Sequence, residues 1–433
     1  MKKQSIGIGL MGLGVIGGQV ARVLIEKAEI LAEPVGCPLV LRKIKIIEAD
    51  LSRQQMKEMG PQLFTTDDDE FFTTPDMDIV VEAIGGENPA RQYLRRALSA
   101  GKHVVTSNKE VIAKYGAELM ALAQQNNVGL GYEASVGGGI PLIAPFQRDL
   151  VANRINGIYA IINGTTNYIL TRMSQEDTDF ASVLGQAQKL GYAEADPRND
   201  IDGTDAAYKL AILASLAFKS QIRPDDIYRE GISRLDSRDF RYAKELGFAI
   251  KLLAIAKRSD KAIEVRVHPA FVPKDSFLAN VSGVYNAVLV EGDLVGKVIF
   301  LGEGAGPLPT SSAVIADVVS AARDIVSGVG SGATRQFKPD KTIKPMAEIE
   351  TRYYIRMNVA DRAGVLAQIS QVLGDHNIGI SSFIQKEADA VKETAEIVIM
   401  THPAKEAAVV KALSELKTLE VVKEINNSIR VEV

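Results

Sequence analysis

The sequence predicts an α/β protein with three parts: a doubly wound Rossmann domain, an α+β domain, and a C-terminal ferredoxin-like domain of βαββαβ order. Three observations lead to this prediction. A glycine-rich turn follows an apolar segment near the N-terminus, strand-like and helix-like segments then alternate, and a βαββαβ pattern follows a polar stretch. At 433 residues the chain is too long for one ordinary core, so two or three domains are expected.

The first domain begins with the apolar segment 5–11 (SIGIGLM), which is typical of a buried strand. The turn GLGVIG (12–17) and a helical segment follow it. The further strands are expected near 42–49, 78–84, 102–106 and 128–132, and the clearest intervening helices at 89–100 and 109–126. Such alternation implies a parallel sheet with right-handed crossovers.

The pattern changes after about residue 135, where strands and helices mix. Strands are expected near 155–163, 262–268 and 284–300, and helices at 179–190, 203–219 and 239–256. Residues 353–433 then give strand, helix, two strands, helix and strand. The expected domains are 1–134, with helix 307–328 packing back on it, then 135–306, a linker at 329–350, and 351–433.

The composition narrows the possible classes of protein. A net charge of −4 offers no basic patch for nucleic acid, and no apolar run reaches the length of a membrane span. The single cysteine, Cys37, excludes a disulfide within the chain and fits a reducing compartment. The N-terminus enters a strand directly and is not typical of a signal peptide, so a cytoplasmic location is expected. The four histidines have no metal-ligand spacing.

The turn at 12–17 predicts a dinucleotide site, because it lies between a strand and a helix at the start of an alternating region. Glycines there let the backbone approach a pyrophosphate at the helix N-terminus. Asp50, after the second strand, favours NAD because it would bind a ribose 2′-hydroxyl and repel a 2′-phosphate. Arg53 and Lys57 lie close by and could pair with that phosphate, so NADP stays open.

The segment 191–209 (GYAEADPRNDIDGTDAAYK) places acidic residues ahead of Lys209, which then enters an apolar run. If a helix begins near Thr204, then Asp205 and Lys209 are four residues apart and share a face. A surface ion pair is one interpretation. The apolar helix favours another, in which a partly buried Lys209 transfers a proton.

Two further segments carry candidate ligands. Lys109 follows the fourth strand, at the sheet edge where open α/β sheets bind ligands, although it could instead be an exposed lysine beside a helix cap. The segment 133–141 (EASVGGGIP) combines a glutamate with an irregular glycine turn. It is either an interdomain hinge or an oxygen-lined site for Na⁺ or K⁺.

Taken together, GLGVIG (12–17), VEAIGG (81–86), TSNKE (106–110), YEASVGGGIP (132–141), NGTTNYIL (163–170) and the segment 191–209 resemble homoserine dehydrogenase, and the C-terminal part resembles the ACT regulatory domain of its longer form. The resemblance covers the chain in order. It implies Lys209 as the catalytic proton donor, with Asp205 and Lys109 assisting, and Glu194 and Asp200 around the substrate amino group. It implies nucleotide contacts at Gly12, Leu13, Gly14, Val15, Ile16, Gly17, Asp50, Ser107, Lys109, Gly191 and Gly306, and a monovalent cation site at Glu133 and the carbonyls of Val136, Gly138 and Ile140. Many relatives have an arginine where this chain has Ala49, which weakens an NADP preference.

The resemblance implies NAD(P)-dependent interconversion of L-homoserine and L-aspartate 4-semialdehyde, in the biosynthesis of threonine, methionine and isoleucine. The residues fit this chemistry, because a lysine near carboxylates can supply a proton while carboxylates hold an ammonium group. A different NAD(P)-dependent amino-acid dehydrogenase and a non-catalytic nucleotide sensor remain alternatives. A homodimer or homotetramer is expected, with L-threonine as the effector bound at the ACT domain.

Overall fold

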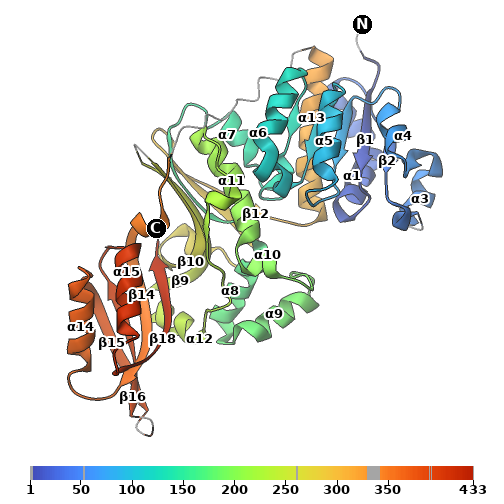
Figure 1. Cartoon of the computed structure of the whole chain (residues 1–433). Coiled ribbons are helices and arrows are strands. Elements are labelled where there is room, and N and C mark those ends of the chain that lie inside the picture. Colours follow the sequence, from blue (N-terminus) through green and yellow to red (C-terminus); the bar gives the residue numbers. More distant parts are fainter. Residues whose placement is uncertain are drawn as a thin grey trace. The chain divides into compact units, whose positions relative to one another are not determined.

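The computed structural model describes residues 3–51, 54–259, 262–328, 342–389, 391 and 393–432. Its contacts divide the chain into two compact units, which are described separately (Figure 1). The first unit comprises 1–155, 208–224 and 292–340, and the second comprises 156–207, 225–291 and 341–433. Residues 329–341 of the expected linker, Arg53, and the side chain of Lys57 lie outside the described part.

The first unit contains a parallel sheet in the order β3-β2-β1-β4-β5-β6. Its strands are β1 (Ile6–Met11), β2 (Leu39–Lys45), β3 (Phe64–Thr65), β4 (Ile79–Glu82), β5 (His103–Thr106) and β6 (Leu130–Gly131). This is the strand order of a doubly wound dinucleotide-binding fold, which confirms the predicted fold class. The second strand ends earlier than expected, because Glu48–Asp50 forms a 3₁₀ turn.

Helices cover the sheet of the first unit. They are α1 (Val15–Glu26), α2 (Ala28–Val35), α3 (Gln54–Met59), α4 (Asp68–Thr73), α5 (Ala90–Ser99), α6 (Lys109–Gln125), α7 (Ile143–Gln147) and α13 (Pro307–Ser327); β12 (Gly296–Glu303) precedes α13. Although α13 is distant in sequence, it packs against α1 and α2 and adds Val314 and Val318 to the hydrophobic core around β1. Helix α13 is therefore part of the hydrophobic core of the first unit (Figure 1).

The second unit contains a sheet in the order β11-β7-β9-β10-β18-β14-β16-β15. The strands are β7 (Ile155–Ile161), β8 (Tyr228–Arg229), β9 (Phe248–Arg258), β10 (Ala262–Pro273), β11 (Tyr285–Gly292), β13 (Thr342–Ile343), β14 (Glu350–Ala360), β15 (Ile380–Asp389), β16 (Thr394–Thr401), β17 (Ala404–Lys405) and β18 (Val422–Val431). The helices are α8 (Gly164–Glu176), α9 (Phe180–Lys189), α10 (Arg198–Ile201), α12 (Ser237–Glu245), α14 (Val365–Asp375) and α15 (Glu406–Leu416); α11 (Thr204–Phe218) begins in this unit and continues into the first.

One element of the second unit was wrongly predicted. The helix expected at 239–256 ends at Glu245, and β9 follows it. Gly247 has φ +83°, a left-handed conformation that favours glycine and ends the helix. Strand β9 then pairs with β7 on one side and β10 on the other, so sheet pairing overrides the helix propensity of its Ala, Leu and Lys residues.

The C-terminal βαββαβ domain continues the sheet of the second unit. Its last strand, β18, pairs with β10 in parallel through Ala270 opposite Arg430 and Phe271 opposite Val431. The Phe271 ring also stacks on Tyr354, with 4.5 Å between the ring centroids. Within this unit the C-terminal domain is therefore packed against the domain before it.

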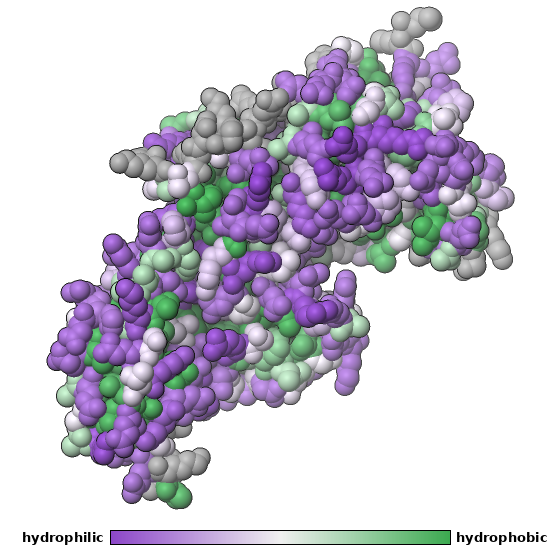
Figure 2. Space-filling model, in the orientation of Figure 1, coloured by the Kyte–Doolittle hydropathy of each residue, from purple (hydrophilic) through white to green (hydrophobic). Residues whose placement is uncertain are grey.

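Hydrophilic residues cover most of the face seen in the space-filling view, and hydrophobic residues form scattered patches (Figure 2). Exposed apolar side chains include Ile30, Leu294 and Leu308. Within the described ranges, no helix combines the length and the apolarity that crossing a membrane requires.

Candidate active site

The glycine turn after β1 has the geometry of a pyrophosphate cradle. Gly12 has φ +92°, and a Cβ on it would lie 2.7 Å from the Ala83 carbonyl oxygen. A Cβ on Gly17 would lie 2.0 Å from the Gly12 oxygen, so both positions require glycine for packing. A Cβ on Gly14 would meet no atom within 4 Å. Gly14 is also the N-cap of α1 and provides no side-chain cap, so the first amides of this helix are not capped by its side chain and suit a phosphate.

A buried carboxylate organises the adjacent strand ends. Glu82, at the end of β4, is fully buried and accepts hydrogen bonds from the Ile84 amide (2.8 Å), the Gly85 amide (3.2 Å) and the Thr106 hydroxyl. Thr106 in turn accepts from the Asn108 amide at 2.9 Å, and Asn108 caps α6. Sequence reasoning missed this role of Glu82. The only signal was a carboxylate at the end of an apolar strand.

Lys109 is the first residue of α6, directly after the Asn108 cap, and it is partly buried. Ser107 lies in the connection between β5 and this cap. A cation at a helix N-terminus opposes the helix dipole, which costs about 0.3–1 kcal/mol. A lysine at this disfavoured position is easier to explain by a ligand than by the stability of the helix.

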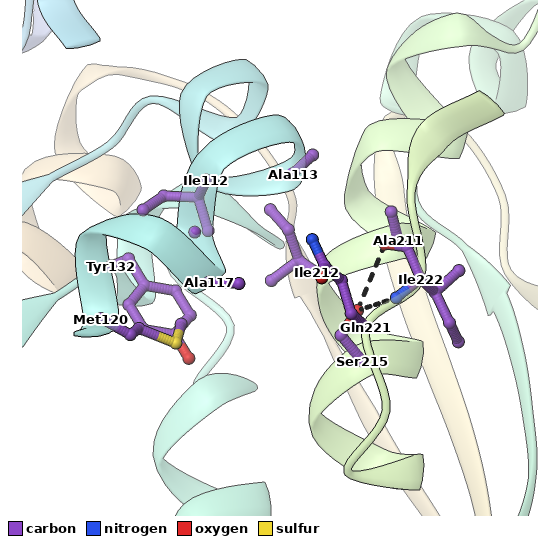
Figure 3. Close-up of a pocket in the computed structure, with 11 residues that line it drawn as sticks. Ile112, Ala113, Ala117, Met120, Tyr132, Ala211, Ile212, Ser215, Gln221 and Ile222 are labelled. Atoms are coloured by element: carbon purple, nitrogen blue, oxygen red, sulfur yellow. Dashed lines mark hydrogen bonds between the residues drawn. The ribbon is translucent and has the colours of Figure 1, made fainter. Parts of the chain in front are cut away.

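A narrow pocket separates α6 from the part of α11 in the first unit (Figure 3). Small residues of both helices line it, including Ala113 and Ala117 of α6 and Ala211 of α11. Its volume of about 20 Å³ would hold a single water molecule. The Ser215 hydroxyl on its wall is bonded to the Ile222 backbone (3.0 Å from the amide nitrogen). Beside this pocket, Lys114 of α6 lies over the ring of Tyr208 of α11, with 5.6 Å from its Nζ to the ring centroid.

The acidic segment before Lys209 is organised by Asn163, the N-cap of α8. The Asn163 amide donates to Asp200 Oδ1 at 2.7 Å and to Asp205 Oδ2 at 2.8 Å, and its oxygen accepts from the Thr166 amide at 2.8 Å. Asp205 is 4% exposed. One side chain therefore fixes two of the predicted carboxylates, which are five residues apart in the sequence. Sequence reasoning did not find this link.

The helix predicted near Thr204 forms as α11, with Asp205 in its first turn. Lys209 follows four residues later on the same face and is 8% exposed, so an exposed surface ion pair does not describe it. A buried lysine beside a carboxylate is a suitable group for moving a proton.

Two predicted residues lie apart from the Asn163 cluster. Glu194 is exposed, between α9 and α10, and its backbone oxygen accepts from the Gln188 amide at 3.1 Å. Gly191, directly after α9, is exposed with φ +77°. Neither takes part in the hydrogen bonds that Asn163 makes. Gly306, in contrast, is the N-cap of α13 in the first unit, with φ +117° and no side-chain cap.

The segment 133–141 forms a compact, buried turn in which Gly137 and Gly138 have φ +76° and +55°. A Cβ on Gly138 would lie 2.7 Å from the carbonyl of Gly304, so the turn requires glycine there. The Glu133 carboxylate does not face this turn's carbonyls as a ligand. It accepts from the amides of Leu142 (2.6 Å), Ile143 (2.7 Å) and Ala144 (2.8 Å), where α7 begins.

The carbonyls of Val136, Gly138 and Ile140 belong to this same turn, together with the backbone oxygen of Glu133, which lies 3.4 Å from the Val136 amide. Backbone oxygens are suitable ligands for hard cations. No group of three or more His, Cys, Asp or Glu residues in the described part could hold a metal ion.

Asp50 lies at the end of the 3₁₀ turn that follows β2 and is partly buried. Strand β2 is next to β1 in the sheet, so Asp50 follows the strand that usually supplies the ribose contact.

Comparisons with known proteins agree with these features. A model described as the NAD-binding domain of homoserine dehydrogenase matches residues 12–133, the model of homoserine dehydrogenase itself matches 141–319, and the ACT domain model matches 353–421. Homoserine dehydrogenase of Neisseria gonorrhoeae is 43% identical, with 99% of this chain and 98% of the relative covered. That of Bacillus subtilis is 38% identical, with 99% of each chain covered.

Solved structures give the same result. The crystal structure of a homoserine dehydrogenase from Thiobacillus denitrificans has a TM-score of 0.92 at 41% identity and covers 100% of this chain and 99% of its own. A hyperthermophilic archaeal homoserine dehydrogenase in complex with NADPH has a TM-score of 0.62 at 30% identity, covering 73% of this chain and 97% of its own.

Proposed function

Because the chain belongs to the homoserine dehydrogenase family, as the sequence predicted, we propose that it interconverts L-homoserine and L-aspartate 4-semialdehyde. A single observation carries the proposal: one Asn163 amide joins buried Asp205, in the first turn of the helix that carries buried Lys209, to partly buried Asp200 of the preceding helix α10. That arrangement provides a site for an ammonium group next to a group that transfers protons. NAD(P) supplies or accepts the hydride when it is bound.

In the reducing direction, hydride adds to the aldehyde carbon and Lys209 donates a proton to the aldehyde oxygen, which gives the alcohol. In the oxidising direction, Lys209 takes the hydroxyl proton as hydride leaves the same carbon. Asp200 and Asp205 bind the substrate ammonium, Asp205 also orients Lys209, and Lys109 contacts the reacting end of the substrate. Glu194, in the exposed segment between α9 and α10, is the third carboxylate proposed to bind the ammonium.

The nucleotide is bound in this proposal by Gly12, Leu13, Gly14, Val15, Ile16 and Gly17 of the turn, together with Asp50, Ser107, Lys109, Gly191 and Gly306. The open space at Gly14 and the lack of a side-chain cap on α1 support this set. Asp50 favours NAD, so NADH is accepted as well as NADPH.

We expect steady-state assays with homoserine and each nucleotide to show turnover. Replacing Lys209 by alanine should lower kcat by about 10²–10⁴-fold while nucleotide affinity changes little. The matched control is Lys219→Asn, at the exposed end of the same helix, where φ is +54° and asparagine is tolerated. If the Lys209 variant keeps more than about a third of wild-type kcat, or if wild type reduces no semialdehyde, the assignment is wrong. Turnover of a different amino acid alone would favour another dehydrogenase, and no turnover a nucleotide sensor.

A monovalent cation, Na⁺ or K⁺, binds in the turn at 133–141 in this proposal. The carboxylate of Glu133 is bonded to three amides, so its backbone carbonyl would be the ligand, with those of Val136, Gly138 and Ile140. The cation would hold the turn in its positive-φ conformation.

An amino acid binds in the C-terminal ACT domain in this proposal, and we take L-threonine as the effector. A cavity of about 230 Å³ lies where β14 passes into α14, lined by residues 359–366 with Phe383, Gln385 and Ile397. Gly364 caps α14 with φ +87° and no side-chain cap, which supports binding of an α-carboxylate there. The assembly proposed is a homodimer or homotetramer in the cytoplasm.

A further inference from the structure

Lys251 is a buried lysine on β9 that the proposed mechanism does not use. It is 5% exposed, and no carboxylate of the described part of the chain forms an ion pair with it. Burial alone lowers its pKa to about 8. Its Nζ donates to the carbonyl oxygen of Val281 and lies 3.4 Å from Asn167 Oδ1. Because burying an ammonium group without a counter-charge is costly, its contacts must have a specific role.

Asn167 is the polar partner of Lys251 on α8, and it is 1% exposed. Its Nδ2 lies 3.3 Å from the carbonyl oxygen of Val281, and 3.0 Å from those of Gly283 and Tyr285. Thr171, one turn further along α8, donates to the backbone carbonyl oxygen of Asn167 at 2.7 Å and accepts from the Gly283 amide at 3.1 Å. The segment 281–285 is therefore fastened along one face of α8.

The fastened segment reaches the first residue of α8. A Cβ on Gly164 would lie only 2.9 Å from the Val284 carbonyl oxygen, so the segment presses against the start of the helix. The preceding residue is Asn163, whose amide bonds both Asp200 and Asp205. The Asn163 side chain makes three hydrogen bonds of 2.7–2.8 Å, so it has a single orientation and does not tolerate a shift of the helix.

We propose that Lys251 and Asn167 are positioning residues for substrate binding: by fastening the segment 281–285 to α8 they fix Asn163, which holds Asp200 and Asp205 where they receive the substrate ammonium. The inference rests on the proposed function of those two carboxylates. The inference assigns Lys251 to the amino-acid site and not to the nucleotide site. Each contact that links Lys251 on β9 to Asn163 lies within the second unit.

The first test replaces Lys251 by methionine, which keeps the length of the side chain and removes its charge and its donors. The control is Lys257→Met on the same strand, because Lys257 contacts Glu432 (3.2 Å) and the Tyr159 ring, away from α8. We expect the Lys251 variant to raise KM for homoserine about tenfold, with a smaller change in kcat and with KM for the nucleotide within about twofold of wild type. The control should leave both KM values within about twofold.

A second pair of variants covers the case in which the Lys251 variant does not fold. Thr171→Val removes the hydroxyl that joins Asn167 to Gly283 at nearly constant volume, and should raise KM for homoserine at least about threefold. Thr171→Ser should restore it. The inference alone is overturned if wild type is active and the Lys251→Met variant folds with the homoserine KM of Lys257→Met. The same holds if Thr171→Val folds with the homoserine KM of Thr171→Ser. An inactive wild type would instead count against the proposed function.

Discussion

Asp317 gives a prediction whose size follows from its surroundings. It lies on α13, and its Oδ2 accepts from the Glu133 amide at 2.8 Å. Burial, and secondarily the nearby Glu133 carboxylate, raise the pKa of Asp317 from 3.8 to about 7, although the amide bond acts in the opposite direction. The folded protein thus binds this proton more tightly than the unfolded chain does. The stabilisation is complete below pH 3.8 and is lost as the pH rises to about 7.

The perturbation is Asp317→Asn, which removes the charge and keeps an acceptor for the Glu133 amide. With these pKa values, wild type would lose about 3 kcal/mol of stability between pH 5 and pH 8 through this group. Asp317 keeps some contact with solvent, which screens the charge, so we expect roughly half of that. The Asp317→Asn variant should not show this loss of stability between pH 5 and pH 8.

The assay is amide hydrogen exchange along α13, since a chain with two units need not unfold in a single step. At pH 8 the α13 amides of the variant should exchange about tenfold more slowly than those of wild type. At pH 5 the two should agree within about threefold. The control is Asp324→Asn on the same helix. Burial raises the pKa of Asp324, but nearby His103 opposes this shift, so the effect of the control substitution should be smaller. Equal exchange of wild type and the Asp317 variant at pH 8 would refute the reasoning.

Three predictions concern ligands. Replacing Asp50 by serine should raise the ratio of kcat/KM with NADPH to that with NADH at least about tenfold, because a 2′-phosphate is no longer repelled; an unchanged ratio would show that Asp50 does not contact the ribose. Replacing Na⁺ and K⁺ by tetramethylammonium should lower activity by at least about fivefold, and full activity without them would leave the 133–141 turn as a hinge. L-Threonine should bind the whole protein and weaken homoserine affinity by about 5–150-fold, and Gly364→Val, which cannot adopt φ +87° without strain, should abolish that response. No threonine binding by calorimetry at millimolar concentration would contradict this last prediction.

The sequence predicted those features that depend on local patterns. The turn at Gly12, the start of α11 near Thr204 and the order of the C-terminal elements follow from residues close together in the chain. Strand β9 could not be predicted in this way, because its Ala, Leu and Lys residues also suit a helix and only its pairing with β7 and β10 decides the outcome.

The same distinction applies to the candidate site. Lys209 and Asp205 were found from their spacing, and the structure shows both to be buried. The role of Asn163 was missed because its partner Asp205 is 42 residues away in the sequence. At Glu133 the sequence predicted a cation site, and that stays a prediction. The structure adds that the Glu133 carboxylate accepts from three amides nine to eleven residues later in the chain, a pairing that no local pattern indicates.

Contacts of the C-terminal domain link the cavity proposed for an effector to the carboxylates proposed to bind the substrate, all within the second unit. Strand β14 borders the cavity at its end and carries buried Arg356, which donates to Asp239 of α12 at 2.7 Å. Helix α12 contacts α8, where Arg241 lies 3.6 Å from Asp177.

Helix α8 begins at the Asn163 cap, so contacts through β14, α12 and α8 link the cavity to Asp200 and Asp205, the two carboxylates proposed to bind the substrate. The contact between β14 and α12 is costly to break, because separating Arg356 from Asp239 would leave the buried Asp239 carboxylate without its cation, at a cost of about 3–5 kcal/mol. A path of contacts alone does not produce regulation. Threonine changes substrate affinity only if it binds more tightly to one arrangement of β14 and α12 than to another, and the size of its effect measures that difference.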